Sequence, residues 1–227
     1  MDRPAESYFV KIAHRGASAY EPENTIRSFS RAIELKADMI ELDVRKSLDG
    51  RLVVIHDSKV DRTTNGKGLV GQKSLSELKE LDAGMGERIP TLEEAIESAA
   101  GKTKFVIELK EDGLEEQVIK VIRDYGLKED VFIVSFRPVR LKAVKELEPG
   151  LKTGLILFAS ADPLRTAERC GADVVAPFRW FITRSLADRA RLSGLYLFTW
   201  TVDDKENAER LRDLGVNGIV TNKPDLL

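Results

Sequence analysis

The sequence contains a single cysteine, Cys170, only two histidines, and no long hydrophobic run. One cysteine excludes an intramolecular disulfide and a cysteine-based zinc cluster, and we expect Cys170 to be a small buried residue at a helix end. No apolar segment approaches the length of a transmembrane helix. Residues 1–7 lack the regions of a signal peptide, so we expect a cytoplasmic protein.

The sequence also has no large excess of charge of either sign, because its 36 basic and 38 acidic residues give a formal net charge of -2. Without a positive field over the surface, nucleic acid is not an expected partner. With 42% hydrophobic and 33% charged residues, the composition is that of a globular protein. The length of 227 residues fits one α/β barrel, and we expect a single domain spanning 1–227.

Short β-branched or aromatic runs alternate along the chain with amphipathic stretches bounded by Gly and Pro. This pattern is typical of βα units around a parallel sheet. It predicts eight strands, at 8–14, 39–45, 104–110, 131–136, 152–158, 173–178, 195–202 and 218–222. It predicts seven helices between them, at 25–36, 91–100, 114–125, 139–147, 163–170, 185–192 and 205–214. No Gly-rich dinucleotide fingerprint follows the first strand, so a TIM (β/α)8 barrel is favoured over an open doubly wound sheet.

Two features depart from a regular barrel. The segment 57–90 is far longer than a common βα loop and is interpreted as a small insertion after strand two, forming one wall of the substrate cleft. A short return strand at 51–56 precedes it, and 74–81 is expected to be a small helix with Ser74 as N-cap. After strand eight the chain is too short for a full closing helix, so we expect a truncated final helix. Something else must then cover the seam, which is the outer side of the barrel where the last strand meets the first.

Carboxylates alternate with aliphatic residues in the second and third long strands. The period of two places Glu41 and Asp43 on the face opposite Ile40 and Leu42, and it places Glu108 similarly in the next strand. Three acids pointing into the barrel would repel one another, and a divalent cation, Mg²⁺ or Ca²⁺, would relieve this repulsion. A salt-bridge network with Arg15, Arg45 and Lys110 is the alternative.

Both histidines fall at expected strand ends, with His14 ending the first strand and His56 ending the return strand. General acid and base groups in this fold belong at the carboxyl ends of the strands. Arg15 and Lys110 are candidates for binding a phosphoryl group.

Two further residues lie near the same ends of the strands. Trp200 is either a wall of the cleft or a core residue. Asn24 is expected to cap the first helix, with a reach into the active site as the alternative.

The order and spacing of several short stretches resemble the glycerophosphodiester phosphodiesterase family over nearly the whole chain. These stretches are His14-Arg15-Gly16, Pro22-Glu23-Asn24-Thr25, Glu41-Leu42-Asp43-Val44, His56-Asp57 with Arg62-Thr63-Thr64-Asn65-Gly66, Ile89-Pro90-Thr91-Leu92, Glu108-Leu109-Lys110 and Thr199-Trp200-Thr201-Val202. The resemblance implies a TIM barrel that binds Mg²⁺ or Ca²⁺ and releases sn-glycerol 3-phosphate and an alcohol. It implies roles for these residues, with Glu41, Asp43 and Glu108 holding the metal, His14 and His56 as the acid/base pair, and Arg15 and Lys110 binding phosphate.

The sequence departs from the family pattern at Asn222, where relatives commonly carry Asp, and this puts a supporting role of that carboxylate in doubt. The short final segment leaves open a homo-oligomer in which a neighbouring subunit covers the seam. Lysophospholipase D chemistry at the same site is the closest alternative function. A non-catalytic binding barrel is a more distant one, and the complete set of His14, His56 and three acids argues against it.

Overall fold

Eight parallel strands close into a barrel in the computed structural model, which describes residues 9–226. Tyr8, where the first strand was expected to begin, lies outside the described residues, as do residues 1–7 and 227. The strands are β1 (Val10–Ala13), β2 (Met39–Lys46), β4 (Lys104–Leu109), β5 (Val131–Ser135), β6 (Lys152–Leu157), β7 (Val174–Pro177), β8 (Tyr196–Thr199) and β9 (Gly218–Thr221). Each pairs in parallel with the next, and β1 pairs with both β2 and β9. The predicted TIM barrel is confirmed.

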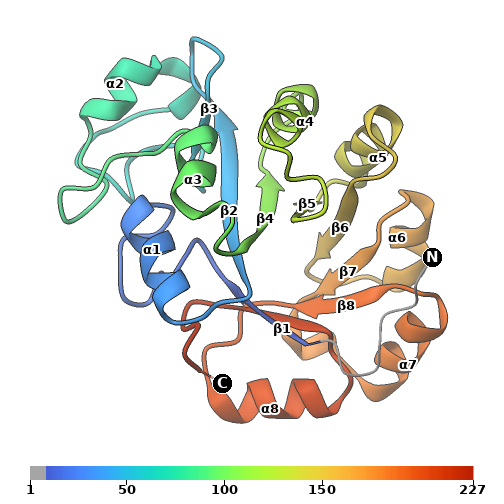
Figure 1. Cartoon of the computed structure of the whole chain (residues 1–227). Helices are drawn as coiled ribbons and strands as arrows, with labels where there is room; N and C mark the ends of the chain where they lie inside the picture. The colour runs from blue at the N-terminus through green and yellow to red at the C-terminus, as the bar shows by residue number, and fades with distance from the viewer. Residues whose placement is uncertain (1–8, 227) are drawn as a thin grey trace.

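Seven helices surround the strands and connect them (Figure 1). They are α1 (Ile26–Glu34), α3 (Leu92–Ala99), α4 (Glu115–Asp124), α5 (Pro138–Leu147), α6 (Pro163–Arg169), α7 (Arg184–Leu192) and α8 (Lys205–Asp213). Several begin at a side-chain cap, as at Thr91, whose hydroxyl accepts from the backbone N–H of Glu94 while the Glu94 carboxylate accepts from that of Thr91. Such caps satisfy N–H groups that a helix leaves unpaired in its first turn.

The alternation of side chains along each strand separates two kinds of core. One cluster fills the inside of the barrel and includes Ile12, Val106 and Phe198. The other aliphatic side chains of the strands face outward and pack against the helices in two clusters, which include Ile40 and Val175. This inner cluster is apolar, and the three carboxylates and His14 lie beyond it, toward the carboxyl ends of the strands.

The expected insertion follows β2. A short strand, β3 (Leu52–Val54), runs antiparallel to β2, and the chain then forms the 3-10 helix η1 (Val70–Gln72) and helix α2 (Leu75–Glu80) before returning to α3. Ser74 caps α2 in a capping box with Glu77, as predicted. In Figure 1 this segment stands apart from the ring of helices, next to α1 and α3. It contains a hydrophobic cluster of its own, made of Val53, Ile55, Val60, Val70, Leu78, Ala83 and Ile89.

The last described residues, 222–226, form turns after β9, and no helix follows β9 within the described chain. Phe9 and Leu226 pack against the outer core cluster that includes Ile219 of β9, and so contribute apolar surface near the closing strands. No helix among residues 9–226 is both long enough and apolar enough to cross a membrane.

Candidate active site

Three buried carboxylates meet at the carboxyl ends of β2 and β4. Asp43 and Glu108 are direct neighbours in the register of the two strands, and Glu41 lies two residues before Asp43 on the same face. One oxygen from each of the three groups lies within 4.8 Å of the others. The period of two along β2 and the parallel pairing with β4 therefore bring these acids together.

Burial sets the protonation of this acidic cluster. It raises the pKa of Glu41 well above its ordinary value, and the charges of Asp43 and Glu108 add to that effect. Burial, followed by the charge of Asp43, raises the pKa of Glu108 to about 7. For Asp43, burial acts in the same direction, but Lys110 and Arg15 more than offset it and hold its pKa below the ordinary value. Asp43 Oδ1 is buried without a hydrogen-bond partner. Three oxygen donors with one unsatisfied atom fit a hard divalent cation.

Two cationic side chains border the acids. Lys110 Nζ lies 2.8 Å from Glu108 Oε1 and 3.5 Å from Asp43 Oδ1. Arg15 Nε lies 3.2 Å from Asp43 Oδ2, and the Arg15 backbone N–H donates to Glu41 Oε2 at 2.9 Å. Arg15 and Lys110, two of the three cations named in the alternative salt-bridge network, thus contact the acids.

Arg45, the third member of that alternative network, does not join it. Its Nη1 lies 3.3 Å from Glu111 Oε2, and its Nε donates to the backbone carbonyl of His56 at 2.9 Å. Arg45 therefore holds the backbone at His56, and the cationic side chains that contact the acidic cluster are those of Arg15 and Lys110.

His14 follows β1 and is fixed through one ring nitrogen. Its Nδ1 lies 2.7 Å from Asn222 Oδ1, while Asn222 Nδ2 donates to Asp203 Oδ2 at 2.6 Å. Because a carboxylate only accepts, the amide oxygen must face His14, and Nδ1 carries the proton. Burial and then the charge of Arg15 lower the pKa of His14. Nε2 is left as the ring atom available for proton transfer.

Asn222 is the residue that departs from the family pattern, and it supports His14 as an amide in place of a carboxylate. Ser18 Oγ donates to the same Oδ1 at 2.8 Å, and the Asn222 backbone N–H donates to Asp203 Oδ1 at 2.7 Å. The Asn222 amide therefore connects the His14 ring to the carboxylate of Asp203.

His56, two residues beyond β3, is fixed in the same manner. Its Nδ1 lies 2.6 Å from Asp57 Oδ1, which again leaves Nε2 for proton transfer. Burial lowers the pKa of His56, while Asp43 and Asp57 act in the opposite direction. The two histidines thus differ in their partners, an amide for His14 and a carboxylate for His56.

An ion-pair network that sequence reasoning missed connects His56 to Arg15. Arg62, from the insertion, donates from Nε to Asp57 Oδ2 at 2.7 Å and from Nη1 to Glu23 Oε2 at 2.7 Å. Glu23 Oε1 also accepts from Arg15 Nη1 at 2.9 Å. The hydrogen bond to Arg62 holds the pKa of Asp57 below its ordinary value, so Asp57 stays ionised beside His56. The stretches containing Glu23 and Arg62 were noted in the sequence, but their side chains were given no role.

The expectation that Asn24 caps the first helix is wrong. The N-cap of α1 is Thr25, whose backbone is extended and whose side chain accepts from the Ser28 N–H. Asn24 has a left-handed backbone with φ of 58°, which turns its side chain away from the helix and toward the acids. Its Nδ2 donates to Asp43 Oδ2 at 2.9 Å. Asn24 therefore orients one of the three carboxylates.

A cavity of about 200 Å³ opens at this end of the barrel. Its polar side is lined by His14, Arg15, Glu41, His56 and Glu108. Its other side is apolar, with Phe136 and Trp200 at the top, and the indole is fixed because Trp200 Nε1 donates to the Ala176 carbonyl at 2.9 Å. The structure thus brings six of the eight residues singled out in the sequence to one cavity. The other two, Asp43 and Lys110, contact its lining residues.

Comparison with known proteins gives a consistent match. Residues 14–226 match the model of the glycerophosphoryl diester phosphodiesterase family. A glycerophosphodiester phosphodiesterase of Caldanaerobacter subterraneus is 46% identical over 230 residues, covering 95% of each chain. The structure of a glycerophosphodiester phosphodiesterase from Agrobacterium tumefaciens has a TM-score of 0.88 at 31% identity, covering 96% of this chain and 98% of the other. An Oleispira antarctica phosphodiesterase in complex with its product sn-glycerol 3-phosphate has a TM-score of 0.87 at 31% identity, covering 95% and 94%.

Proposed function

This chain belongs to the glycerophosphoryl diester phosphodiesterase family and is a phosphoric diester hydrolase, and from this membership we propose how its own residues act. The proposed substrates are small glycerophosphodiesters, which are hydrolysed to sn-glycerol 3-phosphate and an alcohol. The observation that carries the proposal is the meeting of His14, His56 and three buried carboxylates at one cavity. The product complex of the Oleispira antarctica relative supports the identity of the product.

Glu41, Asp43 and Glu108 would hold one divalent cation, Mg²⁺ or Ca²⁺, because hard oxygen ligands suit these ions. When bound, such a cation stabilises negative charge on the phosphoryl oxygens. Arg15 and Lys110 would bind the remaining phosphoryl oxygens, Arg15 through its planar fork and Lys110 as a point charge. Lys110 is held at the edge of the site by Glu108, 2.8 Å from its ammonium group.

The two histidines would divide the proton transfers. One Nε2 takes the proton from the 2-hydroxyl of the substrate glycerol as that oxygen attacks phosphorus, and the other gives a proton to the departing alcohol. In the second half, water opens the cyclic phosphate and the protons move in the reverse directions. Asn222 and Asp57 keep Nδ1 protonated on the two rings, so each Nε2 alternates between acceptor and donor.

Trp200 would bind the part of the substrate that lies away from the phosphate. Its indole is fixed by a hydrogen bond and stands with Phe136 on the apolar side of the cavity. That apolar side favours lysophospholipase D activity as the second candidate function, since an acyl chain would lie against these rings.

The test is hydrolysis of glycerophosphocholine, glycerophosphoethanolamine and a lysophosphatidylcholine in EDTA and after addition of Mg²⁺ or Ca²⁺. Release of glycerol 3-phosphate that depends on the metal supports the proposal, and turnover of the lysolipid alone supports the second candidate. We expect His14→Ala and His56→Ala to lower turnover by about 10²- to 10⁴-fold with an unchanged circular dichroism spectrum. Near wild-type activity in either variant would contradict the assignment of the pair.

A further inference from the structure

Asp203 lies where the barrel closes, in the segment that follows β8. The Val202 N–H donates to the Val220 carbonyl at 3.0 Å, so this segment continues alongside β9. One carboxylate oxygen of Asp203, Oδ1, accepts from the backbone N–H of Asn222 at 2.7 Å and from the hydroxyl of Thr221 at 3.1 Å. The other oxygen, Oδ2, accepts from the Asn222 side chain at 2.6 Å. The carboxylate therefore holds both the backbone and the amide group of Asn222.

The amide group of Asn222 has two possible orientations, and two of its neighbours are compatible with both. The neutral ring of His14 is compatible with both because either ring nitrogen can carry the proton. The Ser18 hydroxyl oxygen lies 2.7 Å from the His14 carbonyl oxygen and 2.8 Å from Asn222 Oδ1. A hydroxyl that gives its hydrogen to the carbonyl can still accept from an amide N–H. Neither His14 nor Ser18 can therefore fix the orientation of the amide.

Asp203 is the neighbour whose hydrogen-bonding role is fixed. A carboxylate accepts and does not donate, so the Asn222 amide must turn its NH₂ group toward Asp203, and its oxygen then faces His14. In the opposite orientation two oxygens would stand 2.6 Å apart with no hydrogen between them. That arrangement would leave acceptors on both residues unsatisfied, which costs more than a hydrogen bond of ordinary strength contributes.

We propose that Asp203 is a positioning residue that acts through Asn222 to hold the proton of the His14 ring on Nδ1. Nε2, which faces the reaction, is then the nitrogen that accepts a proton. The effect on the ring follows from the contacts alone, whereas its importance for hydrolysis rests on the proposed function. A purely structural role, in which Asp203 only holds the backbone at Asn222, would leave the position of the ring proton unaffected.

Asp203→Asn should move the ring proton to the other nitrogen. The new amide would keep its oxygen at the position of Oδ1, where two donors meet it, and would place its NH₂ group against the side chain of Asn222. Asn222 would then turn its oxygen toward residue 203 and its NH₂ group toward His14, so Nδ1 must accept. Asp203→Asn/Asn222→Asp should reverse this change, because a carboxylate at 222 accepts from both of its neighbours.

The experiment is long-range ¹H–¹⁵N NMR of the untagged chain labelled with ¹⁵N-histidine, with Mg²⁺ present. The sequence has only two histidines, so His56→Ala identifies the signals of His14. Burial lowers the pKa of His14, so the ring is neutral at about pH 8 and its spectrum shows which nitrogen carries the proton. We expect Nδ1 in the wild type and in the double variant, and Nε2 in Asp203→Asn. In Asp203→Asn, kcat for glycerophosphocholine should fall about 10²-fold, and the double variant should recover about tenfold or more.

Asp204→Asn is the matched control, because it makes the same change at the next residue. The Asp204 carboxylate caps α8 by accepting from the Asn207 N–H at 2.9 Å, and Asn is an equally good N-cap. This variant should keep the wild-type tautomer and kcat.

Three outcomes would each overturn the proposal about Asp203. They are a wild-type His14 ring protonated on Nε2, a ring in Asp203→Asn that stays protonated on Nδ1, and a double variant that does not return the proton to Nδ1. The wild-type spectrum tests the proposal even where a variant fails to fold. A chain that shows the expected tautomers but hydrolyses no glycerophosphodiester would contradict the proposed function alone.

Discussion

Arg62 is expected to position His56 and Arg15 at once, and its removal tests the network that spans them. The guanidinium makes four contacts of 2.7 to 3.2 Å, two with Asp57 and two with Glu23. The side chain is 48% exposed, so solvent screens these pairs and each contributes about 0.5 kcal/mol to stability. Arg62→Ala should thus lower the free energy of unfolding by only about 1–2 kcal/mol.

The effect on catalysis should be larger than the effect on stability. Without Arg62, Asp57 keeps only His56 as a partner and Glu23 keeps only Arg15, so both supported side chains gain freedom. Loss of a residue that supports an active-site group from behind commonly lowers activity 10- to 100-fold, and we expect kcat for glycerophosphocholine to fall by about this factor. Arg62→Lys, which can reach one carboxylate but not clamp two, should recover part of the loss.

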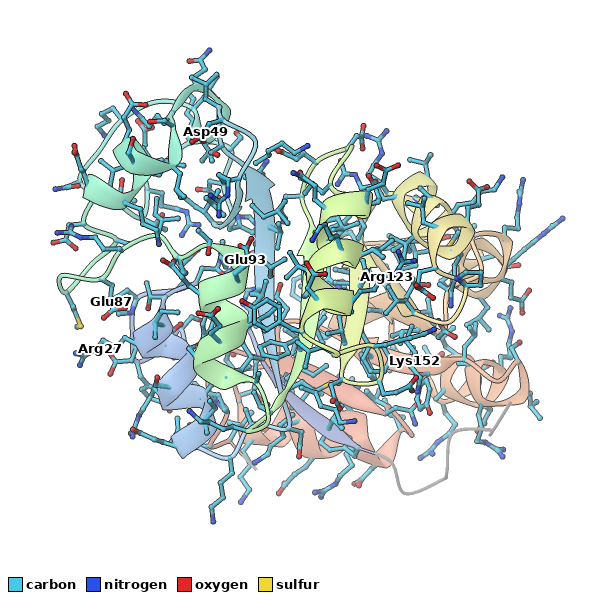
Figure 2. The ribbon with its side chains drawn as sticks, turned by 45° about the horizontal axis from the view of Figure 1, so that its top comes forward. Arg27, Asp49, Glu87, Glu93, Arg123 and Lys152 are labelled. Atoms are coloured by element: carbon cyan, nitrogen blue, oxygen red, sulfur yellow. The ribbon has the colours of Figure 1, made fainter. Side chains whose placement is uncertain are left out.

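Two comparisons separate positioning from general damage. In an Asp57→Asn background, Arg62→Ala should have much less further effect on kcat, because the path to His56 is already broken. Arg27 is the matched control, since it is 50% exposed, pairs with Glu21, does not line the cavity and lies at the outer side of α1 (Figure 2). The reasoning is refuted if Arg62→Ala keeps kcat within about twofold of the wild type, or if Arg27→Ala loses as much.

Three further predictions follow from individual contacts. In EDTA the folded pKa of Glu108 is about 7 against an ordinary value of 4.5, so the folded state binds more protons between these values. The contribution of Glu108 to the free energy of unfolding should therefore fall from pH 5 to pH 8 by on the order of 3 kcal/mol, and the slope in urea titrations of Glu108→Gln should be smaller by this amount while the slope due to Glu41 stays. Asn24→Ala should destabilise by about 1 kcal/mol more than Asn24→Gly, because both lose the hydrogen bond to Asp43 but only Ala is strained at positive φ; equal urea midpoints would contradict this. Gly16→Ala would place a Cβ 2.3 Å from Ser28 Oγ at a φ of +81°. It should cost about 3 kcal/mol and lower the Tm by roughly 10 °C in a thermal scan, and an unchanged Tm would count against the geometry.

Much of the fold could be predicted because the barrel depends on local patterns. Runs of β-branched residues, strand periodicity and turn residues identified all eight strands, and most bounds are within two residues of those observed. The strand expected over 195–202 ends earlier, at Thr199, and Trp200 extends it only as an isolated bridge to Phe178. The meeting of Glu41, Asp43 and Glu108 follows from strand periodicity once β2 and β4 are neighbours.

Contacts that depend on loops could not be predicted in the same way. Arg62 and Glu23 are 39 residues apart, and their contact depends on how the insertion folds back over the first βα segment. Nothing local indicated the left-handed backbone of Asn24, which decides whether its side chain caps the helix or reaches Asp43. The contact of Asn222 with His14 could have been predicted from the sequence, because closure of the barrel places the end of the last strand beside the end of the first.

The separate hydrophobic cluster of the insertion has a consequence for how the enzyme fails on heating. Since five of the seven buried members of this cluster lie within 57–90 and none belongs to a barrel cluster, we expect the segment 57–90 to open as a unit while the barrel stays folded. Opening would withdraw Arg62 and Asp57 from His56 without exposing the main core. Thermal inactivation should then precede global unfolding. Between the two temperatures the barrel should stay folded, the enzyme should be inactive, and activity should return on cooling.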